Sequence, residues 1–133
     1  MITIKLPYPI SANVYWRHRV VGKLAMVYVS AEAKAFKQRV GWIAKAAGCK
    51  PIVGPVSVKY VLHPKRNKDG SASKVRLDLS NIDKVLEDAL NGIAFGDDNQ
   101  VEEIYKRIGD PVPDGGVTVT ISEFKADDLL TTL

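Results

Sequence analysis

The sequence predicts an α+β domain with two layers, in which a mixed β-sheet is covered by two main helices. Three observations support this prediction. The chain has 133 residues, the size of one ordinary domain, and 46% of them are hydrophobic, which is enough to fill a core. Segments with the two-residue period of strands alternate with segments of helical period. Their order is strand, helix, strand, helix, strand, strand, which indicates two packed layers.

The first elements are strands. Apolar and polar residues alternate over residues 2–6, which predicts a half-buried strand. Pro7 ends this strand because proline cannot donate to a sheet ladder. We therefore expect a loop over residues 7–13, and then a short strand over residues 25–29.

A helix and a further strand follow. Ser30 precedes an apolar stripe at helical spacing that continues to Ala47, so Ser30 is the predicted N-cap. Gly48 stands where a helix ends. Alternating apolar residues then predict a second clear strand over residues 56–62.

The remaining elements surround a second helix. Residues 64–77 are basic and rich in small polar residues, so we expect a mobile loop. A helix is predicted over residues 80–91, with Gly92 at its end. The final strands are expected over residues 101–108 and 117–124. No linker divides these elements, so we predict one domain over residues 1–124 and a flexible tail over residues 125–133.

Charge is divided unevenly along the chain, whose net charge is +4. Residues 1–75 hold 14 lysines and arginines against two acids, whereas residues 76–133 hold five against 13. This division predicts a basic surface suited to a polyanion such as nucleic acid. It also predicts an acidic cluster, which a divalent cation would neutralise. The alternative is that each half simply solvates its own surface.

Several features restrict the class of protein. Cys49 is the single cysteine, so no disulfide forms within the chain, and we expect a cytoplasmic protein. No apolar run has the length of a signal peptide or a membrane span, so we expect no association with membranes. No glycine-rich phosphate motif is present, and we expect no nucleotide cofactor.

Acidic residues flank the second predicted helix. Asp78 comes just before it, and Asp97 and Asp98 follow it. Because strand ends and helix ends meet at one edge of a layered fold, these carboxylates can converge on a hard cation such as Mg²⁺. Lys84 lies on the polar face of the helix, where it can neutralise phosphate charge or protonate a leaving oxygen.

Each of these features also has a purely structural interpretation. Lys84 can form an exposed ion pair with Asp88 one turn away, which contributes little to stability. Ser80 and Asp83 can form a capping box. Residues 96–99 can be a polar turn.

A resemblance to a known family covers about residues 9–124. Five runs carry this resemblance, namely Pro9–His18, Val29–Glu32, Asp78–Lys84, Glu87–Gly92 and Asp97–Val101. With these runs the chain resembles RusA-type Holliday junction resolvases, which show an Asp-x-Asp-Asn segment, a lysine three residues after the Asn, an Asp-Ala-Leu segment and an Asp-Asp-x-Gln-Val segment.

The resemblance implies a homodimeric endonuclease that binds four-way DNA junctions and cuts two strands symmetrically with Mg²⁺ or Mn²⁺. Asp78 and Asp98 are the implied metal ligands, and Lys84 is the implied catalytic lysine. Ser80 replaces the second acid of the family's Asp-x-Asp-Asn segment, and a hydroxyl is a far poorer metal ligand than a carboxylate. Either Asp97, Asp83 or a bound water then supplies the missing ligand, or metal binding is weakened.

Two other functions remain open. The replacement at Ser80 suits a relative that binds junctions and cuts them poorly or not at all. A metal-dependent hydrolase of small phosphoesters is a third interpretation, although a small substrate needs no extended basic surface.

DNA contacts are predicted on two basic stretches and in the family motif. Basic residues beside aromatics suit phosphate contact and stacking, although Trp16 can instead pack in the core or at a dimer interface. The basic loop before Asp78 can close on DNA, or it can be simply solvated. The predicted DNA-binding residues are Asn13, Tyr15, Arg17, His18, Lys65, Arg66, Lys74, Arg76 and Asn81.

Overall fold

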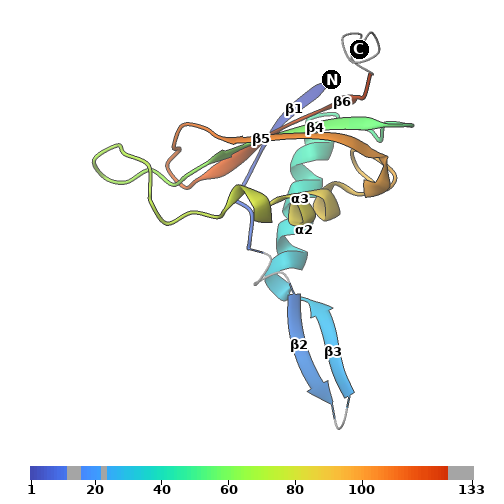
Figure 1. The fold of residues 1–133 in the computed structure, drawn as a ribbon, viewed down its shortest axis with the longest axis horizontal. Coiled ribbons are helices and arrows are strands. Elements are labelled where there is room, and N and C mark those ends of the chain that lie inside the picture. The colour runs from blue at the N-terminus through green and yellow to red at the C-terminus, as the bar shows by residue number, and fades with distance from the viewer. Residues whose placement is uncertain (12–15, 22–23, 126–133) are drawn as a thin grey trace, which may run out of the picture.

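The structure, a computed structural model, describes residues 1–11, 16–21 and 24–125, with side chains for residues 1–11 and 30–125. Four strands form a mixed sheet in the order β1-β6-β4-β5 (Figure 1). β6 is antiparallel to both of its neighbours, whereas β4 and β5 are parallel. The bounds of these strands are Ile2–Leu6 (β1), Val56–His63 (β4), Val101–Ile108 (β5) and Gly116–Glu123 (β6).

The residues of β4 alternate between a buried face, which the helices cover, and an exposed face. Val56, Val58, Tyr60 and Leu62 are completely buried, because alternate residues of a strand point to the same face. Lys59, between two of them, is exposed on the other face. Both helices lie on the buried face (Figure 1). This arrangement confirms the predicted α+β class, with a mixed sheet and two main helices in a single domain.

The long helix α2 (Ala31–Ala46) begins and ends where its sequence predicts. The Ser30 hydroxyl accepts a hydrogen bond from the backbone N–H of Ala33 at 3.1 Å. Gly48, just beyond the helix, has a φ of +81°, a conformation that glycine adopts without steric cost. The buried stripe that packs the helix into the core consists of Ala33, Phe36, Val40 and Ala44.

The second helix is shorter than predicted. Residues 80–91 were expected to be continuous, but a 3₁₀ turn, η1 (Leu79–Asn81), precedes α3 (Asp83–Leu90). The capping box of Ser80 and Asp83, which was the structural alternative for these residues, does not form, because Ile82 is the N-cap residue and makes no side-chain cap bond. A buried Ile82 and four buried residues within α3 hold this helix against the core.

A β-hairpin that the sequence analysis missed in part projects away from the sheet (Figure 1). β2 (Trp16–Val21) pairs with β3 (Leu24–Val29) in antiparallel register. β3 was expected as a short strand over residues 25–29, whereas β2 was not predicted. The available signal was Gly22-Lys23 between two strand-forming runs, since a two-residue link that begins with glycine is typical of hairpins.

The basic segment over residues 64–77 was expected to be a mobile loop, but it carries a hydrogen-bonded turn. The backbone N–H of Asn67 donates to Ser71 at 2.8 Å, and that of Ser73 donates to Lys65 at 2.8 Å. Arg66 donates from its backbone N–H to Val112 at 2.9 Å, which connects the segment to the turn before β6.

Among the described residues, no helix has the length and hydrophobicity to cross a membrane.

Candidate active site on the crossover between β4 and β5

Lys84 is the centre of a cluster of charges on the crossover that joins β4 to β5. Its Nζ lies 3.3 Å from Asp88 Oδ1 and 3.5 Å from Asp98 Oδ2. Asp88 is one turn further along α3, so the predicted ion pair is present, but Asp98 comes from a different element. The hydrogen bond and charge of Asp88, with a smaller effect of Asp98, raise the pKa of Lys84. Lys84 is therefore a cation at neutral pH, which suits contact with a phosphate.

The loop that carries Asp98 is held by Gln100, a residue the sequence analysis did not single out. The Gln100 Oε1 accepts hydrogen bonds from the backbone N–H groups of Gly96 at 2.8 Å and Asp97 at 2.9 Å. Its Nε2 donates to the carbonyls of Ile52 at 2.9 Å and Gly54 at 2.7 Å. One amide therefore joins this loop to the segment before β4.

Asp97 and Asp98 have different environments although they are neighbours. Asp97 is the N-cap of the 3₁₀ turn η2 (Asp98–Gln100), and its Oδ1 accepts from the backbone N–H of Asn99 at 3.0 Å. This hydrogen bond is the largest cause that lowers the pKa of Asp97. Asp97 therefore helps to shape the polar turn that was the structural alternative. Asp98 is the member of the pair that reaches Lys84.

Asp78 is presented at the N-cap position of η1, where its side chain makes no cap hydrogen bond. The Tyr8 hydroxyl accepts a hydrogen bond of 2.7 Å from the backbone N–H of Leu77, which ties the residue before Asp78 to the segment after β1. Ser80 and Asn81, within η1, are exposed. This positioning role of Tyr8 was not predicted from the sequence.

The start of α3 is fixed by Lys106 of β5, which was also not predicted. Lys106 Nζ donates to the carbonyl of Leu79 at 3.0 Å and to Asp83 Oδ2 at 2.9 Å. The other carboxylate oxygen of Asp83 is buried and has no hydrogen-bond partner. This pair explains the 3₁₀ turn, because the carbonyl of Leu79 is directed toward β5.

Negative charge accumulates around Glu87 on α3. Burial, followed by the charges of Asp83, Asp98 and Asp88, raises the pKa of Glu87 to about 7 against the opposing effect of Lys84. Asp83 and Glu87 lie one helical turn apart, so they share one side of α3. A pKa raised in this way indicates a negative potential that a bound cation would relieve.

The carboxylates do not form a closed cage. Within the described residues, no group of three His, Cys, Asp or Glu side chains is arranged to hold a metal ion. The structure thus joins Asp98 with Lys84 and Asp88, and it does not gather Asp78, Asp97 and Asp98 around one point. Mg²⁺ needs only one or two protein carboxylates and keeps several waters. The donor set and the negative potential therefore fit a hydrated divalent cation.

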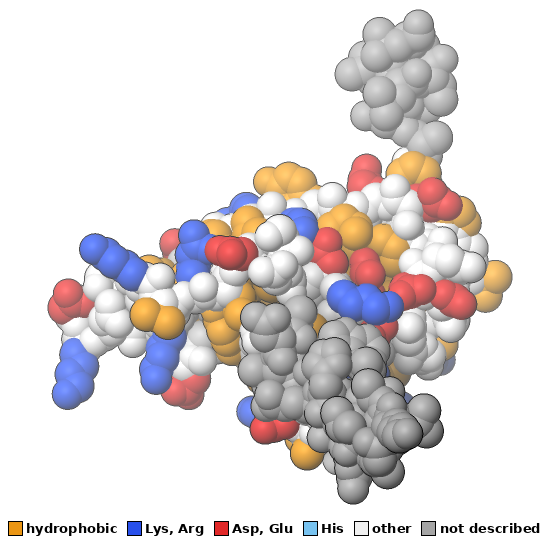
Figure 2. All heavy atoms as spheres, turned by 60° about the horizontal axis from the view of Figure 1, so that its bottom comes forward, with side chains coloured by type: hydrophobic (Ala, Val, Ile, Leu, Met, Phe, Trp, Pro, Cys, Tyr) orange, Lys and Arg blue, Asp and Glu red, His pale blue; other side chains and the backbone are white. Residues whose placement is uncertain are grey.

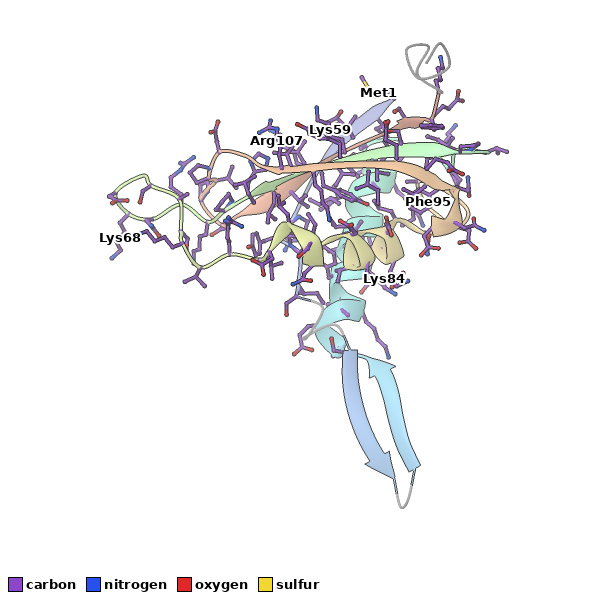
Figure 3. The ribbon with its side chains drawn as sticks, viewed as in Figure 1. Met1, Lys59, Lys68, Lys84, Phe95 and Arg107 are labelled. Carbon is purple, nitrogen blue, oxygen red and sulfur yellow. The ribbon has the colours of Figure 1, made fainter. Side chains whose placement is uncertain are left out.

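The predicted basic contacts project from the crossover. Figure 2 shows basic side chains on the protruding part of the molecule, and acidic side chains gathered toward the other end around a basic one. Lys68 lies at the tip of the protruding segment in Figure 3, whereas Lys84 lies on the side of α3 that faces away from the sheet. Lys65 and Lys74 are exposed on this segment.

Of the other predicted DNA contacts, two arginines donate hydrogen bonds to backbone carbonyls, and four residues have no described side chain. Arg66 donates to the carbonyl of Pro111 at 3.2 Å, and Arg76 donates to the carbonyl of Leu77 at 3.2 Å. Four further predictions fall where the structure gives no side-chain positions. Asn13 and Tyr15 lie outside the described residues, and Arg17 and His18 lie on β2, whose side chains are not described.

Comparison with known proteins gives matches over nearly the whole chain. The model of the family described as endodeoxyribonuclease RusA matches residues 7–122. A protein of Escherichia coli strain K12 named crossover junction endodeoxyribonuclease RusA is 35% identical over 125 residues, which are 91% of this chain and 93% of that protein. Its namesake from Escherichia coli O139:H28 is 32% identical, with the same coverage of both chains. The namesake from Enterobacteria phage 82 is 34% identical, over 90% of this chain and 92% of its own.

Proposed function

This chain belongs to the RusA family of endodeoxyribonucleases, and on that premise we propose that it resolves four-way DNA junctions by paired, symmetric strand cleavage. One structural observation carries the proposal. Lys84, a cation, lies 3.5 Å from Asp98, which is contributed by a different segment of the same crossover. A cation beside a carboxylate that can bind a metal is the pairing that hydrolysis of a phosphodiester needs.

The proposed cofactor is Mg²⁺, with Mn²⁺ as a substitute. Asp78 and Asp98 would hold the ion, with Asp97 as a further candidate and with water and phosphate oxygens completing its coordination. When bound, such an ion activates a water and neutralises charge that develops on the phosphate. Support comes from the exposed Asp78 without a capping role and from the negative potential around Glu87.

The chain's own residues have distinct proposed roles. Lys84 neutralises the phosphate, a role that its raised pKa supports by keeping it a cation, and it is also the proposed donor of a proton to the leaving oxygen. Gln100 holds the loop of Asp98, and Tyr8 holds the segment before Asp78. The proposed DNA contacts are Asn13, Tyr15, Arg17, His18, Lys65, Arg66, Lys74, Arg76 and Asn81.

The proposed assembly is a homodimer. A four-way junction has two equivalent strands at its crossover, and two subunits related by a two-fold axis can each cut one of them. The alternative function is a relative that binds junctions but cuts them weakly or not at all. Ser80 favours this alternative, because it offers a hydroxyl where the family pattern has an acid.

Cleavage of a synthetic four-way junction tests these proposals. The protein and its Asp78→Asn variant are compared in Mg²⁺ and then in Mn²⁺, with a linear duplex as the control substrate. Paired symmetric cuts that disappear in the variant are the expected result. Tight binding of the junction without cutting would establish the binding relative, and Ser80→Asp would then be expected to restore cleavage. A protein that neither binds nor cuts the junction would contradict both functions.

A further inference from the structure

Trp42, on α2, is the most exposed aromatic residue among the side chains that the structure describes. It is 70% exposed, although tryptophan is usually buried over most of its surface. Val40, two residues earlier, is completely buried, and residues two apart on a helix face nearly opposite sides. The indole therefore points away from the core, and an aromatic ring in this position is typical of a surface that contacts a partner.

Two lysines lie on the same side of α2 as Trp42. Lys34 stands eight residues before it and Lys45 three residues after it, and both spacings return to one face of a helix. Both lysines are exposed, and their side chains form no hydrogen bond or ion pair with any other described residue. We call Lys34, Trp42 and Lys45 the α2 face. It extends over about 16 Å, the length of about five base pairs.

The charge of α2 indicates what kind of partner fits this face. The helix carries a single acid, in its first turn, against four basic residues, namely Lys34, Lys37, Arg39 and Lys45. This charge is complementary to a phosphate backbone, and basic side chains around an aromatic ring are typical of surfaces that bind nucleic acid. A two-fold contact of α2 with a second copy would instead place lysines against lysines.

The α2 face adjoins the segment that leads to the candidate active site. Gly41, beside Trp42, packs so closely on Ile93 that a Cβ there would lie 3.3 Å from Ile93 Cδ1. Cys49, just after the helix, donates from its Sγ to the carbonyl of Ile93 at 3.7 Å. Ile93 belongs to the turn between α3 and the loop of Asp98. Both helices also cover the same face of the sheet (Figure 1), so a DNA arm that leaves the site can reach α2.

We propose that the α2 face is a further DNA-binding surface, which holds the backbone of one arm of the junction beside the candidate active site. Lys34 and Lys45 neutralise phosphates, and the ring of Trp42 packs on a nucleotide between them. The inference rests on the proposed action on branched DNA. Because phosphate contacts carry no sequence information, this surface adds affinity for DNA of any sequence.

The fluorescence of Trp42 tests whether DNA covers this face. Trp16→Phe leaves Trp42 as the single tryptophan, so quenching by acrylamide reports the exposure of its ring. A saturating four-way junction in EDTA is expected to lower the quenching constant, because the bound nucleotide shields the ring. An unchanged constant would overturn the inference. Shielding that depends on protein concentration in the absence of DNA would also overturn it, because a second copy would then cover the face.

Junction binding in EDTA over a salt series tests the charges. Lys34→Gln with Lys45→Gln is expected to reduce the slope of log affinity against log salt by about two, one for each lost phosphate contact. Trp42→Ala should weaken binding about tenfold, and Trp42→Phe much less, because a stacking ring remains. The control pair is Lys59→Gln with Lys125→Gln, which removes the same charge from exposed positions outside α2.

The outcomes separate this inference from the proposed function. If the original protein binds the junction, and the α2 variants match the control pair in slope and affinity, the α2 face is not a DNA surface and the proposed function stands. If the original protein binds neither the junction nor a linear duplex, both the inference and the proposed function are wrong.

Discussion

Lys84 is restrained by two carboxylates that come from different elements, and this residue decides how the site can act. Asp88 belongs to the same helix, whereas Asp98 belongs to the following loop. A lysine with a single helical partner would be an ordinary surface ion pair of small value. The second partner directs the ammonium group toward the loop where the cation is proposed to bind.

Replacing Lys84 should therefore affect chemistry more than binding. Lys84→Met is expected to reduce the rate of junction cleavage by about 10²–10⁴-fold, the usual contribution of a positioned acid. Binding of the junction in EDTA should change little, because other basic residues contact the DNA. Gel-based cleavage and binding assays measure both quantities. Lys50→Met removes an exposed lysine as a control, and a Lys84→Met variant that cuts at a tenth of the original rate or faster would contradict the assignment.

Glu87 should make the stability of the protein depend on pH. Its pKa of about 7 in the folded protein lies above the ordinary value of 4.5. The unfolded chain therefore loses this proton first, and the free energy of unfolding falls as the pH rises from about 4.5 to about 7. Burial is the largest cause of this raised pKa, followed by the charges of Asp83 and Asp98 and then Asp88, opposed by Lys84.

Glu87→Gln is expected to remove this dependence. Because Glu87 is about half-buried, solvent screening reduces the expected gain to about 1 kcal/mol at pH 8, with almost none at pH 5. Urea unfolding without divalent ions at the two pH values measures the difference. Glu102→Gln, on an exposed side chain, should show no such change. An equal effect of Glu87→Gln at both pH values would mean that Glu87 is not held at a raised pKa.

At the scale of elements, the Gln100 side chain holds the loop that carries Asp98 against the segment before β4 through hydrogen bonds. Gln100→Ala removes two accepted and two donated hydrogen bonds, and it leaves the half-buried carbonyls of Ile52 and Gly54 unpaired. We expect a loss of about 2 kcal/mol in the free energy of unfolding and a fall in cleavage rate. Chemical denaturation and the cleavage assay measure the two effects. Gln38→Ala, at an exposed position of α2, is the matched control, and equal behaviour of the two variants would exclude the bracing role.

Local signals were sufficient to predict both ends of α2 but not the start of α3. The cap at Ser30 and the glycine at position 48 act over one helical turn, so the sequence contains them directly. The 3₁₀ turn before α3 depends on Lys106, which is 27 residues away from Leu79 and on another element. A hydrogen bond of this separation leaves no periodic pattern in the sequence.

For the candidate site, too, the sequence contained the signals for some residues and not for others. Asp78, Lys84 and Asp98 belong to short motifs and were identified from them. Glu87 was not, because an acid on a helix beside other acids looks the same in sequence whether it is solvated or half-buried over a strand. Gln100 was quoted within a motif without its role, since its four partners lie on two separate segments.

At the scale of the whole molecule, the separation of charge predicts a strong dependence of junction binding on salt. Basic residues project on the 64–78 segment, away from the acidic cluster (Figure 2). Each phosphate contact releases about one counterion, so replacing Lys65 and Lys74 by glutamine should reduce the slope of log affinity against log salt by about two. Fluorescence anisotropy over a salt series measures the slope. Lys50→Gln and Lys125→Gln serve as the control pair, and an unchanged slope would remove this segment from the DNA interface.

The pairing of the first strand with the last has a consequence for how the chain matures. β1 lies at the edge of the sheet and has β6 as its neighbour, with Ile2 opposite Ile121. On a ribosome, β1 leaves the exit tunnel long before β6, its neighbour in the sheet, because more than a hundred residues separate the two strands. Contacts between residues so distant in the chain also form slowly. The strand pairing that joins β1 to the sheet therefore forms only after β6 has been made, late in the synthesis of the chain.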